Sequence, residues 1–502
     1  MAERWNTSAI ICTALGVGLA AGAKPMVAGG LAVLMLAVTV VVATAPRLPR
    51  IFFICLWILV CGYAIGGRAF AYLGIPPLYV GEMVMAIGVG AILSNAGLNV
   101  SLRSPLAWLW LALAAWCASR TVPYIALYRI DALRDAVLWG YGVFTIFVAA
   151  FLQREGSLEA VSRAYARFAP WFILWVPVLW AVTQFGMPQP QLPLSNKQVL
   201  EFAPSCASVH LAGTGTFLLL DLHKGRDAVR KGLHRLPGPL LWTVWFIGFA
   251  LVALHTRGGA LGIIVPMLVV LVARPRTARK LALVGGIAVV FSMMFTVFNL
   301  SFDTGRYRGT VSPEELVRNV TSIFHEDQSD AANREGNRAW RLDWWNTILG
   351  YTVHGPLFWT GKGFGINLAD DDGFQVNELH SLRSPHNGHL TFLARGGVPA
   401  VALWLALQAA FAFTMAHAYL RARRARHEWW QRIDLWIFAY WLSFLANAAF
   451  DVFLESPQGG IWFWSIIGVG IVAAEQQRRL VAPARNVTLP TSARPAALIG
   501  AA

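Results

Sequence analysis

The chain is poor in charge and in cysteine. Charged residues make up 13% of its 502 residues, against roughly 25% in soluble domains, so a soluble globular protein is excluded. Its few cysteines all lie in apolar stretches, which argues against a disulfide framework or a zinc site and favours small core residues. They are Cys12, Cys55, Cys61, Cys117 and Cys206.

Apolar residues dominate the composition. They make up 57% of the chain, with 22 tryptophans. Apolar runs recur from residue 8 to residue 476, and most approach the roughly 20 residues that cross a bilayer as a helix. We therefore predict an all-α polytopic membrane protein with about 12–14 transmembrane helices. The first apolar run lacks a cleavage pattern and is expected to be a retained span.

Basic residues fall in short clusters between the apolar runs. If the spans alternate in direction, all the clusters lie on one side together with the N-terminus, which the positive-inside rule assigns to the cytoplasm. The net charge of +15 is then a topology signal, and a nucleic-acid partner is not predicted. The clusters begin at Arg47, Arg154, Lys224, Arg274, Arg421 and Arg478.

One long segment has the opposite charge balance. Residues 299–385 hold 12 of the 26 acidic residues but only 8 of the 41 lysines and arginines. We predict a large, partly helical periplasmic loop here that carries part of an active site. Transmembrane helices occupy residues 1–298 and 386–480 on either side, and residues 481–502 form a disordered cytoplasmic tail.

Two helices are predicted in this loop. Residues 312–324 begin with a capping box of Ser312 and Glu315. Residues 333–351 place Arg338, Arg341 and Trp345 on one stripe that suits a phosphate beside a sugar. The alternative is that these arginines are solvated or paired with acids such as Asp343. The glycines of "GKGFG" after this helix indicate a tight turn, and the acids of "DDDG" at 370–373 are expected to be solvated, so no metal is predicted.

The stretch "SPHNGHLTFLARGGV" opens the next span. Ser384 and Pro385 are predicted as N-cap and first helical residue, which puts His386 and Asn387 in the first turn. The helix dipole there attracts anions and lowers the pKa of a histidine, so that His386 can act as a general base toward a hydroxyl. The alternative is a hydrogen-bonded interfacial histidine, and this description fits His389 well.

Further ionisable residues lie near the predicted outer ends of spans. Arg257 is isolated and precedes two glycines, and its planar fork suits a diphosphate. Glu82 and His210 are either substrate-binding residues or structural partners of arginines such as Arg68 or Arg257.

These motifs together resemble the O-antigen ligase and polymerase superfamily. The family signature is a His followed by Asn, nine residues and a Gly, and His386, Asn387 and Gly397 match it. "TRGG" around Arg257, "RLDWW" with Arg341 and "GKGFG" occur in the family's order. The motifs cover roughly residues 250–400.

The resemblance implies an inverting glycosyltransferase of the bacterial inner membrane. Such an enzyme moves a glycan from an undecaprenyl diphosphate-linked donor to a glycan or a lipid A core, at the periplasmic face and without a cofactor. Arg257 and Arg341 would hold the diphosphate and His386 would be the base. The expected substrate-binding residues are Asn387, Arg338, Trp345, Glu82 and His210.

Several functions remain open within and beyond this class. A ligase, a polymerase and a protein-glycosylating enzyme differ only in acceptor, and the net acidic loop slightly favours a polymerase. A transporter or flippase of lipid-linked oligosaccharide is the alternative from another class. Transporters place charged residues and broken helices near the membrane midplane, whereas the ionisable residues here gather at the outer ends of spans.

Overall fold

A computed structural model describes residues 47–75, 78–94, 103–192, 198–224, 238–279 and 331–481, with isolated positions between 282 and 311. Nearly all regular structure in these ranges is helical, and the strands are two short antiparallel pairs, Gly74–Ile75 with Leu78–Tyr79 and Phe302–Asp303 with Thr310–Val311. The predicted all-α membrane class is confirmed.

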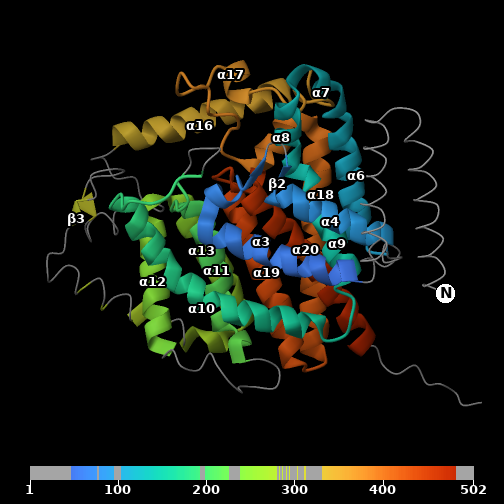
Figure 1. Ribbon diagram of the computed structural model, residues 1–502, viewed down its shortest axis with the longest axis vertical. Helices are drawn as coiled ribbons and strands as arrows, with labels where there is room; N and C mark the ends of the chain where they lie inside the picture. Colours follow the sequence, from blue (N-terminus) through green and yellow to red (C-terminus); the bar gives the residue numbers. More distant parts are fainter. Residues whose placement is uncertain are drawn as a thin grey trace, which may run out of the picture.

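The helices form one bundle with a helical layer over one end (Figure 1). The N-terminal helices are α3 (Leu48–Phe70), α4 (Val80–Ser94), α6 (Pro105–Ser119), α7 (Val122–Tyr128), α8 (Ile130–Gly140), α9 (Val143–Phe151), α10 (Ser157–Gln184), α11 (Pro204–Leu219), α12 (Gly238–His255) and α13 (Arg257–Ala273). The C-terminal helices are α16 (Ala331–Tyr351), α17 (Leu368–Asp372), α18 (Gly388–Arg424), α19 (Glu428–Ala448) and α20 (Pro457–Val481). A short 3-10 turn, η6 (Phe453–Glu455), joins α19 to α20.

Within the described residues, five helices are long and apolar enough to cross a membrane, namely α3, α10, α12, α18 and α20. The pair α8 and α9, bent by 44°, can form a sixth span, and α4, α6 and α13 are shorter apolar helices. The predicted count of spans stays a prediction, because residues 1–46 and most of 280–330 lie outside the described ranges. The expected first span, Cys12 and the predicted helix at 312–324 also lie outside them.

The core of the bundle is built from aromatic residues of α18, α19 and α20. Trp404 stacks on Phe392 with ring centroids 4.6 Å apart, and both side chains are fully buried. Buried indoles need an acceptor for their N–H, and Trp436 donates to the Gly213 carbonyl of α11 at 3.0 Å. Gly213 is needed there because a Cβ atom would lie 2.6 Å from the Tyr440 ring. The last two contacts fix α19 against α11.

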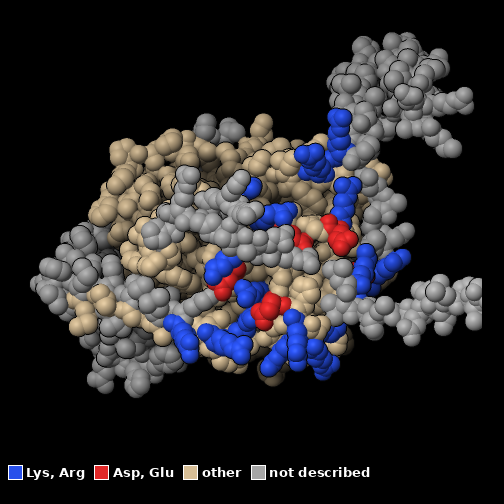
Figure 2. Space-filling model, turned by 90° about the horizontal axis from the view of Figure 1, so that it is seen from below, with Lys and Arg blue, Asp and Glu red and all other residues tan. Residues whose placement is uncertain are grey.

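Basic residues gather at one end of the bundle, and the space-filling view of that end shows them clearly (Figure 2). Arg274 after α13 pairs with Glu428 of α19 at 2.5 Å. Arg421 of α18 donates to the Ala474 carbonyl of α20, and Gln476 reaches the Arg154 carbonyl. The predicted basic clusters that begin at Arg154, Arg274, Arg421 and Arg478 thus share one end of the fold. Helices α16 and α17 lie over the opposite end (Figure 1).

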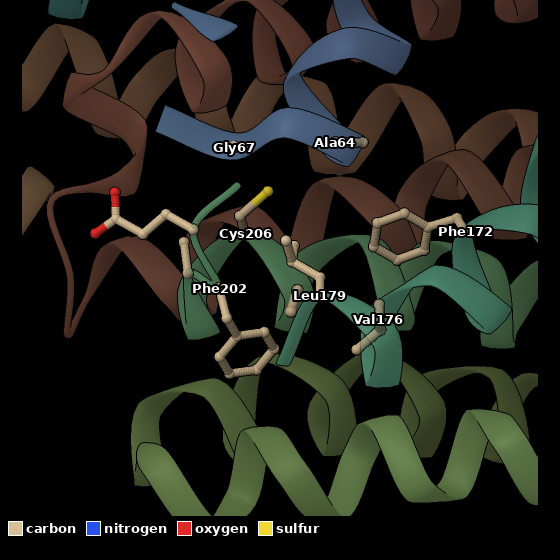
Figure 3. Close-up of a pocket in the computed structure, with 10 residues that line it drawn as sticks. Ala64, Gly67, Phe172, Val176, Leu179, Phe202 and Cys206 are labelled. Carbon is tan, nitrogen blue, oxygen red and sulfur yellow. The ribbon is translucent and has the colours of Figure 1, made fainter. Parts of the chain in front are cut away.

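A small apolar crevice separates α3 from α10 and the start of α11 (Figure 3). The Cys206 sulfur points toward α3, where the helix breaks at Gly67 with a φ of 57°. None of the predicted site residues lines this crevice, and its only charged lining residue is Glu201. Cys55, Cys61, Cys117 and Cys206 are free thiols.

Candidate functional site

The predicted start of the helix at Ser384 is wrong, because α18 begins three residues beyond Pro385, at Gly388. Its N-cap is Asn387, whose side-chain oxygen accepts from the backbone N–H groups of His389 at 3.0 Å and Leu390 at 3.2 Å. His386 therefore precedes the helix instead of lying in its first turn. It adopts a left-handed conformation with a φ of 52°, which is uncommon for a residue other than glycine.

The two histidines of the motif differ in their hydrogen bonding. His389 accepts from the Trp404 indole at its Nδ1, 3.0 Å away, and its Nε2 bonds the Leu445 carbonyl at 3.2 Å. His386 makes no side-chain hydrogen bond to any residue that the structure describes. Burial and the positive charge of Arg341 lower the pKa of His386, against a smaller opposing effect of Asp451. Burial and the neighbouring guanidinium of Arg341 therefore both favour the neutral imidazole.

Helix α16 brings Arg341 and Trp345 to the same place. The Trp345 indole donates to the carbonyl of Pro385, directly before His386, at 3.0 Å. Arg341 donates one Nη1 bond to the carbonyl of Phe450, at 3.1 Å, while its buried Nε has no partner among the described residues. The alternative in which Arg341 pairs with Asp343 is not seen in the described contacts. The pairing of Arg341 and Trp345 on one helix face is as the spacing predicted.

The loop between α19 and α20 connects Arg257 to the cluster of His386, Arg341 and Trp345. Arg257 is exposed at the first position of α13, where Thr256 caps the helix by accepting from Gly259 N–H at 2.7 Å. Gly258 packs so closely on Phe450 that an added Cβ atom would lie 2.7 Å from the Phe450 Cβ. Phe450 therefore lies beside the start of α13 and also binds Arg341, so both arginines flank one short loop.

The glycines of the motifs have backbone reasons. Gly397 has a φ of 72° and a ψ of −171° and breaks α18, and a Cβ atom there would lie 2.5 Å from the Phe358 carbonyl oxygen. Gly361, Gly363 and Gly365 all have positive φ, as a tight turn requires. In this turn, Gly361 packs on the backbone of Arg395, and Gly363 packs on the ring of Tyr124.

A protein-family model described as O-antigen ligase matches residues 242–405. This stretch is an O-antigen ligase domain. The superfamily that the motifs resemble is thereby confirmed, and it is a family of membrane enzymes that transfer glycans. No curated protein matches the chain. The match runs from α12 into α18 and includes Arg257, Arg341 and His386, but α4, α8, α11 and the loop after α19 lie outside it.

Two of the predicted residues lie outside the O-antigen ligase domain. Glu82 of α4 accepts from the Tyr141 hydroxyl at 2.5 Å and from the Tyr79 N–H at 3.2 Å. His210 is fully buried in α11, where its Nδ1 lies 2.5 Å from the Tyr440 hydroxyl. Their observed partners are tyrosines rather than the arginines considered from the sequence. The side chain of Arg338 lies outside the described residues.

The acids at 370–372 have partners within the protein. Lys362 forms ion pairs with Asp371 and Asp372, and the Trp344 indole donates to Asp372 at 2.6 Å. Asp370 pairs with His380 at 2.7 Å. These bonds fold the end of the loop of the O-antigen ligase domain against α16.

Sequence reasoning missed two carboxylates in the loop after α19. Asp451 acts electrostatically on both His386 and Arg341. Glu455 accepts from the Thr391 hydroxyl of α18 at 2.7 Å, and burial raises its pKa to about 7. Single acids in a short interhelical loop carry no signal in the sequence, and only the fold reveals that they adjoin His386.

Proposed function

We propose that this protein transfers a glycan from an undecaprenyl diphosphate-linked donor to the hydroxyl of an acceptor sugar, as a surface polysaccharide polymerase or an O-antigen ligase. The observation that carries the proposal is the pairing of two side chains with free hydrogen-bonding capacity. His386 has a lowered pKa and no side-chain hydrogen bond to a described residue, and the neighbouring Arg341 has an unpaired Nε. A neutral base beside a guanidinium with a spare donor suits attack by a hydroxyl on a carbon that bears a phosphate.

The reaction divides among these groups as follows. A ring nitrogen of His386 takes the proton of the acceptor hydroxyl as its oxygen bonds to the anomeric carbon of the donor sugar. The bond from that carbon to the phosphate oxygen breaks, and its electron pair leaves with the undecaprenyl diphosphate. Arg341 and Arg257 offset the charge that develops on the diphosphate. Attack from the side opposite to the leaving group inverts the configuration of the anomeric carbon.

Binding of the rest of the substrates falls to the surrounding residues. Trp345 offers the edge of an indole ring to a sugar beside Arg341, and Asn387 shapes the backbone that carries His386. Arg338, three residues before Arg341 in the sequence, is a further proposed substrate-binding residue. Glu82 and His210 remain proposals as substrate-binding residues, although the partners found for them are tyrosines.

The proposed orientation puts the His386 end of the bundle in the periplasm of a bacterial inner membrane. It is supported by the gathering of arginines at the opposite end (Figure 2), because positively charged residues are retained in the cytoplasm. In this orientation α16 and α17 lie at the periplasmic surface, where the polar head of the donor and the acceptor sugar can both reach them. The regions 299–385 and 386–480 then serve as periplasmic loop and C-terminal span region.

The test is a transfer reaction with the purified full-length protein in nanodiscs. An undecaprenyl diphosphate-linked oligosaccharide is supplied with and without lipid A core, and the products are followed by mass spectrometry. Glycan attached to the core identifies a ligase, and longer lipid-linked chains without core identify a polymerase. A donor left intact under both conditions, together with its movement across the membrane of proteoliposomes, would replace the proposal with transport.

A further inference from the structure

The orientation of His386 has an unusual origin. A catalytic histidine is commonly held by a hydrogen bond from its second ring nitrogen, as both nitrogens of His389 are held here. His386 has no such bond to a described residue. Its left-handed backbone, with a φ of 52°, is also strained and persists only where the surroundings impose it. The direction of its ring is therefore set by whatever fixes the backbone on either side.

Each neighbour of His386 is anchored to a different element. The Pro385 carbonyl is bound by Trp345 of α16, and Ser384 donates to Glu455 of η6. Arg383 donates from Nη2 to Asp135 of α8 at 3.1 Å. On the other side, Asn387 caps α18. Four separate anchors therefore surround His386, whose own side chain has no hydrogen bond to a described residue.

Asp135 is one of the buried anchors, with 7% of its side chain exposed. Its Oδ2 accepts from Arg383 and from the Gly365 N–H at 2.9 Å, and it forms an ion pair with Arg395 of α18 at 2.8 Å. Arg383 in turn donates to the Gly365 carbonyl at 2.9 Å. One carboxylate thus holds together α8, the glycine turn, the segment before His386 and α18.

Such a buried ionic junction needs a reason. Burying charges costs desolvation, and apolar residues of similar size often serve stability as well or better. What a carboxylate with two hydrogen-bond donors and an ion-paired guanidinium provides is a fixed geometry, because each donor has one position and one direction. The junction lies outside the matched O-antigen ligase segment on the side of α8, so the earlier part of the chain takes part in building the site.

We infer that Asp135, through Arg383, is a positioning residue that fixes the backbone turn carrying His386 and thereby aims its imidazole at the acceptor hydroxyl. This inference rests on the proposed function, in which His386 is the base. It assigns to α8 a part in the reaction without any contact with substrate. The donor diphosphate is held from α13 and α16, so loss of the junction should slow the chemical step and leave donor affinity nearly unchanged.

The test uses Arg383→Gln in the full-length protein. This variant keeps the ion pair of Asp135 with the buried Arg395, which Asp135→Asn would break. We expect kcat to fall roughly 10- to 100-fold, since a misplacement of about 1 Å can cost that much, with the donor KM within twofold of wild type. Arg274→Gln is the matched control, because Arg274 is a partly buried arginine paired with Glu428 at the opposite end. It should leave both constants unchanged.

A double-mutant cycle separates positioning from a general structural role. If Arg383 acts only through His386, then Arg383→Gln should not slow the residual reaction of His386→Ala any further. Equal losses in both backgrounds would overturn the inference, as would full activity of Arg383→Gln. If the Arg383→Gln protein does not accumulate, the same double-mutant cycle is measured with Arg383→Lys. This variant keeps the charge but not the fork, so a smaller loss of kcat is expected. Full activity of His386→Ala would instead refute the proposed function.

Discussion

Replacing Arg341 with alanine is expected to slow transfer by a factor that can be worked from its surroundings. One nitrogen of the guanidinium is bound to the Phe450 carbonyl, which fixes the direction of the fork. The buried Nε has no partner among the described residues, and the prediction takes it and one further N–H of the fork as the donors to an anion. Hydrogen bonds to charged groups contribute about 1.5–3 kcal/mol each, so two of them correspond to about 3–6 kcal/mol. At a factor of ten for each 1.4 kcal/mol, kcat/KM should fall roughly 10²- to 10⁴-fold.

The assay follows the consumption of a labelled lipid-linked donor by purified protein in nanodiscs. Arg341→Lys keeps the charge but not the two fixed directions, so its loss should be intermediate. Asn346→Ala changes an exposed residue of the same helix and serves as the control. If Arg341→Ala, present at the normal level, keeps its rate within fivefold of wild type, the assignment of Arg341 to the diphosphate is wrong.

Four further substitutions test other parts of the site. His386→Ala should lower kcat about 10²- to 10⁴-fold, the usual contribution of a general base, with the melting temperature unchanged; a parallel loss of stability would indicate a structural histidine. Asp451→Asn removes the charge that raises the pKa of His386, so the acidic limb of the pH profile of kcat/KM should move to lower pH, and an upward shift would contradict this. Arg257→Lys should abolish transfer because an ammonium cannot bind two oxygens in a plane, whereas activity near that of wild type would make the arginine structural. Gly397→Ala should destabilise the protein by about 1–3 kcal/mol, measured by thermal unfolding in detergent, since the added Cβ would meet the Phe358 carbonyl; an unchanged midpoint would mean that the break in α18 tolerates a side chain.

Much of this site follows from local patterns. The stripe of Arg341 and Trp345 was predicted because residues four apart on a helix share a face, and the glycine turn because its spacing suits positive φ. The start of α18 was misplaced because Ser384 and Asn387 are both good N-caps. Only the observed hydrogen bonds of Asn387 decide between them.

What the sequence could not supply are the partners that the fold brings from far away. Asp135 lies some 250 residues before Arg383, and "DALRD" around it is typical of a solvated helix face with an internal ion pair. Asp451 and Glu455 follow a span and resemble ordinary interfacial acids. Local periodicity predicts which residues share an element, whereas long-range contacts depend on how the helices pack.

The break at Gly397 divides α18 into two pieces of different length and character. The part after the break, to Arg424, has about 27 residues and is about 40 Å long at 1.5 Å per residue, which is more than the roughly 30 Å of bilayer hydrocarbon. Crossing the membrane therefore does not require the part before the break. That part is free to carry Asn387, His389 and the buried Arg395, none of which would be tolerated against lipid. A single glycine thus lets one helix combine a piece long enough to cross the membrane with a buried piece that carries polar residues next to His386.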